Sequence, residues 1–581
     1  MPPRIGGRAD VAQLVERELP KLEVAGSRPV VRLAVQDVFA WQGVEEKNSV
    51  RTRQVESGRR WGRAGSAALV IAAAMACLAA FGAAEAGAAT LPRVHVSGQQ
   101  MRDAYGRQVL LRGVNDTSLT DQYQVNPNLP TVIPLQASDY DRMQGFGFNV
   151  LRLAVNWSKL EPQRGQISQD YIQRIRNVVD NAAAHGIYTV IDMHSGGWGK
   201  DVETKPGEKC PKGLRPSHGW MGAPKWATFI DNKTTCHDDK TNKRTPAVRE
   251  AWTHFWENYS AASWGKKARG IQDHLVMVWA ALAKAFANDR AVAGYDLLNE
   301  AEPGYTGRFQ RFYTTRFDSK AIKAIRHAEH VAHGFSHMIF FEANLTWSQH
   351  GLTSHSPKPG FSHDQNLVYA PHLYGRDVHT TARPVSGVKR DLLRQTRRIL
   401  RLAHKYGTPW WIGEWSFSQL DDDSYKKLLA HIKIQDSNQL GSAWWQWRVA
   451  CGAPQTFDGL DPTPTHRILG NINPAKCPKG TPLPTPKRWR GIIARAYPRY
   501  SPGRLTALKS RGPRMKLKGK SHCSRRFKHR KPKACQLVVW IPNPKHPRVR
   551  GRHLGHIQVH RQTGGWVATA SVGRTYLMRT R

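Results

Sequence analysis

The stretch Gly294-Tyr-Asp-Leu-Leu-Asn-Glu-Ala-Glu-Pro-Gly304 decides the fold, because a short apolar run ends at Asn299 and Glu300 and is followed by a Pro-Gly turn. A run of this length, bounded by turn signals and preceded by a helix-like stretch at 271–287, is typical of a buried parallel strand in α/β architecture. Such strands present their chemistry at their carboxyl ends. A lone Asn-Glu pair is more often a solvated loop, so the interpretation needs a second observation.

That observation is Thr408-Pro-Trp-Trp-Ile-Gly-Glu-Trp415, where another apolar strand pattern ends at Glu414 among aromatic residues. A glycosidase needs two carboxyl groups, one to protonate the leaving oxygen and one to attack the sugar or activate water. The pair of strand-end carboxylates therefore favours Glu300 and Glu414 as catalytic residues.

From residue 94 the chain alternates strand and helix patterns. Strands are expected at 108–115, 148–155, 188–194, 337–342, 367–372 and 441–447, with two more around Tyr295 and Glu414. Helices are expected at 137–143, 169–185, 271–287, 319–333, 389–406 and 425–436. Eight strands with intervening helices predict a (β/α)8 TIM barrel with insertions. An open sheet would not require the residues at the carboxyl ends of the strands to converge. These polar and aromatic residues are Arg152, His194, Glu300, His372, Glu414 and Trp445.

The charge of the chain is uneven. Lys and Arg number 87 against 44 Asp and Glu, and residues 478–581 contain 27 basic and no acidic side chains. The barrel is expected over 90–500 and a small basic C-terminal β-sandwich over 501–581, with strands at 535–541, 555–559 and 565–570. Within it, 509–533 is expected to be a cationic segment that cannot bury itself.

The basic C-terminal region is interpreted as a solubilising surface or one that binds an anionic cell envelope or membrane. Nucleic-acid binding is the rival, disfavoured because no nucleic-acid fold motif is present. His553, His556 and His560 lie close in sequence but make a poor metal site. No metal and no cofactor are expected, and the protein is expected to be a monomer.

The N-terminal region has the parts of an export signal. A basic Arg59-Arg60-Trp-Gly-Arg63, an apolar 66–82 and small residues at 83–89 predict a signal peptide over 59–89, with a membrane anchor as the alternative. Residues 1–58 are interpreted as a mis-annotated extension, because 9–29 resembles the translation of a transfer-RNA gene. The expected protein is secreted or associated with the cell envelope.

Six of the seven cysteines follow the predicted signal peptide. Many connectivities are formally possible, but pairing of neighbours closes the shortest loops and suits an oxidising compartment. Zinc is disfavoured because no Cys-x-x-Cys pair occurs. The predicted disulfides are Cys210–Cys236, Cys451–Cys477 and Cys523–Cys535.

Taken together and in order, eight motifs resemble glycoside hydrolase family five, and within it the endoglycoceramidase-like branch. The resemblance covers residues 94–500, so it implies the same barrel and hydrolysis of a β-glycoside. The motifs are Leu111-Arg-Gly-Val-Asn115, Leu151-Arg152, Leu160-Glu-Pro-Gln-Arg-Gly-Gln166, Asp192-Met-His194, Asn299-Glu300, His372-Leu-Tyr374, Gly413-Glu-Trp415 and Trp444-Trp445.

The resemblance implies that Glu300 is the general acid/base and Glu414 the nucleophile, with Arg152 and Tyr374 orienting Glu414. Arg152 is therefore expected to lower the pKa of Glu414, and a drier wall to raise that of Glu300. A purely structural ion pair is the alternative role for Arg152. Glu302 is the nearest competitor of Glu300, since strand alternation would place both on one face.

The resemblance also implies how the sugar is held. Asn299 would bind the 2-hydroxyl, His194 and His372 would line the subsite, and Trp445 would stack under the ring. Each histidine has an alternative role as a satisfied core residue. Trp444, Trp445 and Trp447 cannot all face inward from one strand.

The expected function is that of a secreted retaining β-glycosidase, endoglycosylceramidase-like, acting on a glycan or glycolipid. The chain departs from the branch pattern at Asn299-Glu-Ala-Glu-Pro-Gly304 and at Ser195-Gly-Gly-Trp198 and the insertion after it. These loops build the substrate wall, so the resemblance does not define the sugar or the aglycone. The alternatives are a β-glucanase or cellulase-like enzyme and a catalytically silent carbohydrate- or envelope-binding protein.

Overall fold

The computed structural model describes residues 91–238, 244–350, 355–375, 384–416, 422–453, 485, 487–524 and 532–581. The predicted extension 1–58 and signal peptide 59–89 lie outside these ranges. So does Cys477, and the predicted Cys451–Cys477 disulfide therefore stays a prediction.

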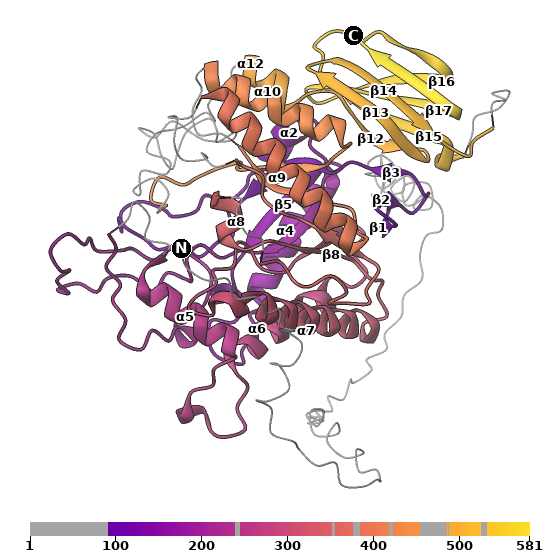
Figure 1. Cartoon of the computed structure of the whole chain (residues 1–581). Coiled ribbons are helices and arrows are strands. Elements are labelled where there is room, and N and C mark those ends of the chain that lie inside the picture. Colours follow the sequence, from indigo (N-terminus) through magenta and orange to yellow (C-terminus); the bar gives the residue numbers. More distant parts are fainter. Residues whose placement is uncertain are drawn as a thin grey trace, which may run out of the picture. The chain divides into compact units, whose positions relative to one another are not determined.

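Eight parallel strands form a closed barrel (Figure 1). They run in the order β10-β11-β4-β5-β6-β7-β8-β9, and a parallel bridge between Tyr369 and Trp410 joins the two ends of this order. All eight strands were predicted from the sequence. They are β4 (Arg112–Asp116), β5 (Val150–Val155), β6 (Tyr188–Met193), β7 (Val292–Asp296), β8 (Met338–Phe341), β9 (Leu367–Tyr369), β10 (Ile412–Trp415) and β11 (Ser442–Trp444).

The predicted helices are also present: α2 (Ala137–Gly145), α4 (Gln169–Ala184), α6 (Ile271–Ala285), α7 (Gln310–Val331), α9 (Val385–Tyr406) and α10 (Asp422–Ser437). Local signals set their ends. The Ser168 side chain accepts the Tyr171 backbone N–H at the start of α4, and Gly407 ends α9 in the left-handed conformation at φ +69°. Helix α7 begins well before the expected 319. Within the described ranges, no helix is both long and apolar enough to cross a membrane.

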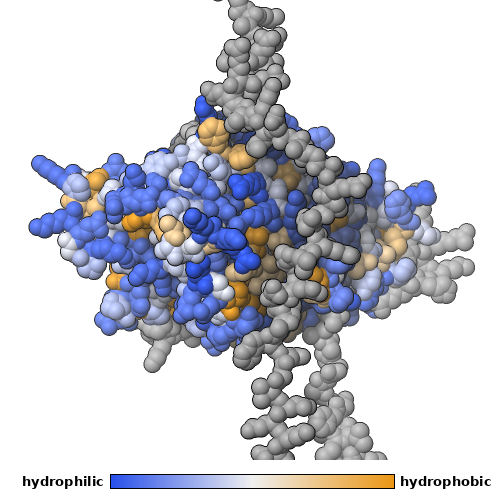
Figure 2. Space-filling view, turned by 90° about the horizontal axis from the view of Figure 1, so that it is seen from below, coloured by the Kyte–Doolittle hydropathy of each residue, from blue (hydrophilic) through white to orange (hydrophobic). Residues whose placement is uncertain are grey.

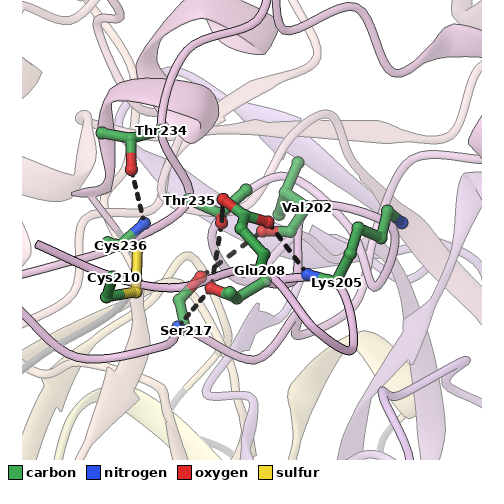
Figure 3. The surroundings of a disulfide bond; sticks show 9 residues. Val202, Lys205, Glu208, Cys210, Ser217, Thr234, Thr235 and Cys236 are labelled. Carbon is green, nitrogen blue, oxygen red and sulfur yellow. Dashed lines mark hydrogen bonds between the residues drawn. A yellow bond between two sulfur atoms is a disulfide. The ribbon is translucent and has the colours of Figure 1, made fainter.

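A long insertion separates β6 from α6 and contains α5 (Pro246–Glu257). The predicted Cys210–Cys236 disulfide closes part of it (Figure 3). Beside this bond Glu208 accepts the Lys205 backbone N–H and the Thr235 hydroxyl at 3.1 and 3.2 Å, which ties two parts of the loop together. The disulfide and these hydrogen bonds thus connect separate parts of the insertion.

The C-terminal strands form an antiparallel β-structure, as predicted. The first half of β17 (Gly565–Thr580) pairs with β15 (Gln536–Ile541), its second half pairs with β14 (Arg514–Lys520), and β16 (Val549–Gln562) pairs along its other edge. Strand β13 (Arg504–Arg511) completes the β14 arm. The two arms share a core that includes Leu517, Val539 and Met578. The predicted Cys523–Cys535 disulfide lies here.

The expectation that 509–533 cannot bury itself is wrong for the part that forms β13 and β14. Burial alternates strictly along Arg514-Met-Lys-Leu-Lys-Gly-Lys520, with Met515 and Leu517 inside and the cations outside. The period of two, rather than the overall composition, decides the outcome. Residues 525–531 lie outside the described ranges.

Residues from the start of the described chain complete this sheet. The strands β1 (Val94–Ser97), β2 (Gln100–Asp103) and β3 (Gln108–Val109) lead to β12 (Tyr497–Ser501), where Val109 pairs with Tyr500. Asp436, at the end of α10, binds this sheet to the barrel. It pairs with Arg112 at 2.9 Å and accepts the Ser510 backbone N–H at 2.7 Å.

Candidate active site

All eight predicted site residues meet at the carboxyl ends of the barrel strands. Arg152 projects from β5, Glu414 lies in β10, and the other six follow β6, β7, β9 and β11. These six are His194, Asn299, Glu300, His372, Tyr374 and Trp445. Contacts between side chains join all eight residues into one network.

Glu300 and Glu414 lie on either side of His372. The His372 Nδ1 atom is 2.7 Å from Glu300 Oε1 and 3.4 Å from Glu414 Oε2, and oxygens of the two carboxylates lie within 4.8 Å of each other. Gly413 permits this arrangement, because a Cβ there would lie 3.2 Å from the His372 ring. Two neighbouring carboxylates at the strand ends are the equipment that a two-carboxylate glycosidase needs.

Glu414 is held from two sides. The Tyr374 hydroxyl donates to its Oε2 atom at 2.6 Å, and Arg152 Nη1 donates to Oε1 at 3.0 Å. Its carboxylate is nearly buried, with 6% of the side chain exposed. Both oxygens are thus fixed by donors, as a nucleophile that must keep one orientation requires.

Arg152 is fully buried and forms ion pairs with four carboxylates. Besides Glu414 it pairs with Asp192, Asp296 and Glu342 at 3.0, 2.9 and 2.6 Å. The three acids come from the ends of β6, β7 and β8, so one guanidinium ties four strands together.

The pKa of Glu414 is raised, whereas we expected Arg152 to lower it. Burial raises that pKa and the nearby Glu300 adds to the effect, while His372 and Arg152 oppose it. Burial is the largest of these effects, so the pKa of Glu414 is raised although Arg152 opposes the shift. Burial likewise raises the pKa of Asp296 well above its ordinary value, although Arg152 opposes it.

For His372 the neighbouring charges, rather than burial, decide the direction of the pKa shift. Burial alone would lower its pKa, but the charges of Glu342 and Glu414, with hydrogen bonds to Glu300 and Glu342, raise it well above the ordinary value. The raised pKa favours the protonated ring, in which Nδ1–H would donate to Glu300 and Nε2–H to Glu342, 2.7 and 3.1 Å away.

Glu342 is the functional residue that the sequence interpretation missed. It follows β8, and besides its contacts with Arg152 and His372 it accepts the backbone N–H of Glu300 at 3.1 Å. Glu300 has φ +40°, a strained value for a residue with a side chain. Glu342 thus helps to hold the strained backbone of the catalytic loop. Its position at a strand end, like that of Glu300, was the available signal.

The remaining residues, His194, Asn299 and Trp445, form a platform beside the catalytic pair. His194 donates Nδ1–H to Asp192 at 2.7 Å and stacks on Trp445, with ring centroids 5.2 Å apart. Trp445 also packs against Tyr374. Asn299 donates to the Ser195 carbonyl at 2.9 Å and accepts from Arg152 at 3.2 Å. As expected, the three tryptophans do not all face inward, because Trp447 packs against α2 and donates its Nε1–H to Asp139 at 3.1 Å.

Glu302 does not share the site. It is buried and pairs with Arg244 at 3.2 Å, and burial raises its pKa. The chain turns at Glu300, so strand alternation does not continue to Glu302.

Among the described residues, three clusters of His, Asp and Glu side chains have the spacing of metal ligands. Asp192, Asp296 and Glu342 form one, but Arg152 lies against all three and supplies the positive charge. The second group is the catalytic pair with His372. The third consists of Asp231, Glu250 and His254, where His254 Nε2 is already 2.9 Å from Asp231.

A closed (β/α)8 barrel with two facing carboxylates at its strand ends places the protein among the glycoside hydrolases. The family model for Cellulase (glycosyl hydrolase family 5) matches residues 103–450. The chain belongs to glycosyl hydrolase family 5.

Known proteins refine this membership. Endoglycoceramidase I of Rhodococcus hoagii (strain 103S) is 29% identical over 303 residues, which cover 49% of this chain and 54% of that protein. An endoglycoceramidase of Cyanea nozakii is 26% identical over 314 residues, 49% of this chain and 58% of that protein. The chain thus matches little more than half the length of these relatives.

Two solved structures match a larger share of the chain. The crystal structure of an endogalactoceramidase superposes with a TM-score of 0.74 at 33% identity, covering 84% of this chain and all of that one. Endo-glycoceramidase II from Rhodococcus sp. superposes with a TM-score of 0.62 at 20% identity, covering 83% and 99%, and shows the shared fold.

Proposed function

We propose that the protein is a secreted, retaining β-glycosidase that cleaves the bond between the glycan and the lipid of a glycolipid. The observation that carries the hydrolysis is the pair Glu300 and Glu414, whose carboxylate oxygens lie within 4.8 Å around His372. The relatives named for glycoceramides support the glycolipid.

In the first step, Glu414 attacks the anomeric carbon and the bond to the lipid oxygen breaks. Glu300 gives its proton to that oxygen, which leaves as the alcohol. Arg152 and Tyr374 hold the attacking carboxylate, and His372 keeps a proton within hydrogen-bond reach of Glu300.

In the second step, Glu300 takes a proton from water, and the water oxygen attacks the anomeric carbon of the glycosyl-enzyme. The bond to Glu414 breaks and the glycan leaves with its original configuration. The platform of His194, Asn299 and Trp445 would hold the sugar through both steps, with Trp445 stacked under the ring.

Secretion is part of the proposal. The signal-like pattern at 59–89 supports it, and so do the disulfides Cys210–Cys236 and Cys523–Cys535, since such bonds persist in oxidising compartments. Expression in the native host, followed by N-terminal sequencing of protein from the medium, tests it. A mature N-terminus near residue 90 is expected, whereas an intact chain kept in the cytosol contradicts export.

A cellulase-like β-glucanase is the second candidate, because the matching family model carries the description Cellulase. Purified protein incubated with β-linked glycolipids, β-glucans and aryl β-glycosides separates the two. Release of an intact glycan and its lipid from a glycolipid is expected. Cleavage of β-glucans alone supports the second candidate, and failure on every substrate, aryl glycosides included, supports a silent binding protein.

A further inference from the structure

One face of the C-terminal sheet carries many exposed cations. It is formed by β13, by β14 and by the parts of β16 and β17 that lie beside β14, and we call it the cationic face. Its basic side chains are exposed, the residues between them in β14 are buried, and β13 also exposes Thr506 and Ala507. The basic side chains are Arg504, Lys509, Arg511, Arg514, Lys516, Lys518, Lys520, Arg550, Arg552 and Arg579.

The strand register aligns these cations in rows. Lys509 pairs with Lys516, Lys516 with Arg579, and Arg579 with Arg550, so four cations lie side by side across four strands. In the next row Lys518 and Arg552 lie on either side of Leu577, and Ala507 completes the row. Like charges directly opposite one another destabilise a sheet. A solubilising role does not require such alignment.

In the part of the chain that the structure describes, the cationic face has no acidic partner. Residues 478–581 contain no Asp or Glu, and among the described residues none of the ten cations forms an ion pair with a carboxylate. Lysines often protect the edges of sheets against pairing, but β14 lies between β13 and β17 and is no edge. Its four cations therefore need another explanation.

We propose that the cationic face docks on an anionic phospholipid bilayer. The cations are distributed over four neighbouring strands, and such a two-dimensional array suits a surface of phosphate groups. Single-stranded nucleic acid would instead favour a groove with aromatic side chains for base stacking, and no aromatic residue is among the outward-facing positions of the rows. Lys and Arg near an anionic leaflet are attracted to it, over about a Debye length.

The choice of a bilayer also rests on the proposed function, because a glycolipid substrate resides in one. Docking through the C-terminal sheet would raise the local concentration of substrate without contributing to the chemistry. Catalysis on a soluble aryl glycoside should therefore be independent of this face.

Sedimentation of the full chain with vesicles tests the proposal. Vesicles of phosphatidylcholine with about one-third phosphatidylglycerol, free of glycolipid, should bind the protein, and pure phosphatidylcholine should not. The variant Lys516→Glu/Arg579→Glu should bind the anionic vesicles at least about tenfold more weakly. The control Arg397→Glu/Arg401→Glu changes the net charge equally on exposed positions of α9 and should bind as the parent does.

Hydrolysis of an aryl β-glycoside by all three proteins confirms that each is folded, and its absence in all three would refute the proposed function while leaving the vesicle result valid. Equal losses in the two variants would show that only net charge matters and would overturn the proposal. Binding of the parent to pure phosphatidylcholine, or tighter binding to duplex DNA than to anionic vesicles, would overturn it as well.

Discussion

The barrel mouth and the cationic face both concentrate charged side chains, but their charges are balanced differently. At the mouth the charges are buried, so two cations, Arg152 and His372, hold five carboxylates at short distances. On the face the charges are exposed and water and salt screen them. Buried charge therefore sets pKa values and geometry, whereas exposed charge governs salt-dependent encounters. The five carboxylates are Asp192, Asp296, Glu300, Glu342 and Glu414.

The largest expected effect of breaking the mouth network is at Glu414. Glu414→Gln keeps the shape but cannot form the glycosyl-enzyme, so kcat should fall at least about 10⁴-fold on every substrate. Kinetics with an aryl and a natural glycoside measure it. Residual activity within tenfold of the parent would remove Glu414 from its role.

Glu342→Gln should lower kcat about 100-fold, because the strained Glu300 loop and His372 lose a shared charged partner. The Glu342 charge raises the pKa of His372, so its removal lowers that pKa, and the alkaline limb of the pH–rate profile should move to lower pH. Glu302→Gln, the same change two residues beyond Glu300, is the control. An alkaline limb that stays in place in Glu342→Gln would reduce Glu342 to a structural role.

Asp436, between the barrel and the sheet, should matter for stability rather than activity. Arg495 and Arg112 outweigh its burial and lower its pKa below the ordinary value. Its stabilising contribution is therefore complete above the unfolded pKa of about 4 and is lost as pH falls through the folded value. Asp436→Asn should cost about 3 kcal/mol of unfolding free energy at pH 7.

Urea unfolding of the parent and of Asp436→Asn at pH 7 and pH 3 compares the two. The difference should shrink at the lower pH. A difference that is the same at both values would show that the charge of Asp436 contributes nothing.

The smallest effect is expected at the platform. Trp445→Ala should raise KM about tenfold, because the sugar loses its stacking surface while the catalytic groups remain. Trp444→Phe, in the buried core next to Trp415, is the control and should lower Tm without changing KM. If the two variants have the same KM, the sugar does not lie on Trp445.

The strands and the catalytic pair could be predicted because their signals are local. Each strand carries its own apolar run and polar end, as at Glu300 and Glu414. The exposed and buried sides of β14 were also visible as a period of two, but net charge masked them. Composition over a long window is thus a poorer guide than alternation.

The role of Glu342 and the raised pKa of Glu414 could not be predicted, because both depend on partners distant in sequence. Arg152 lies 190 positions from Glu342 and 262 from Glu414. Only the closed barrel shows that one guanidinium serves four carboxylates and that burial then outweighs it. The pairing of β3 with β12, far apart along the chain, is non-local for the same reason.

Azide rescue with a dinitrophenyl β-glycoside tests the central claim, that Glu300 and not Glu302 is the acid/base. With Glu300→Ala the good leaving group needs little protonation, so the glycosyl-enzyme forms and then persists. Azide needs no general base and should restore turnover as the glycosyl azide of retained configuration. Glu302→Ala should stay within about tenfold of the parent and gain nothing from azide. Rescue of Glu302→Ala instead of Glu300→Ala, or an inverted azide product, would contradict the account.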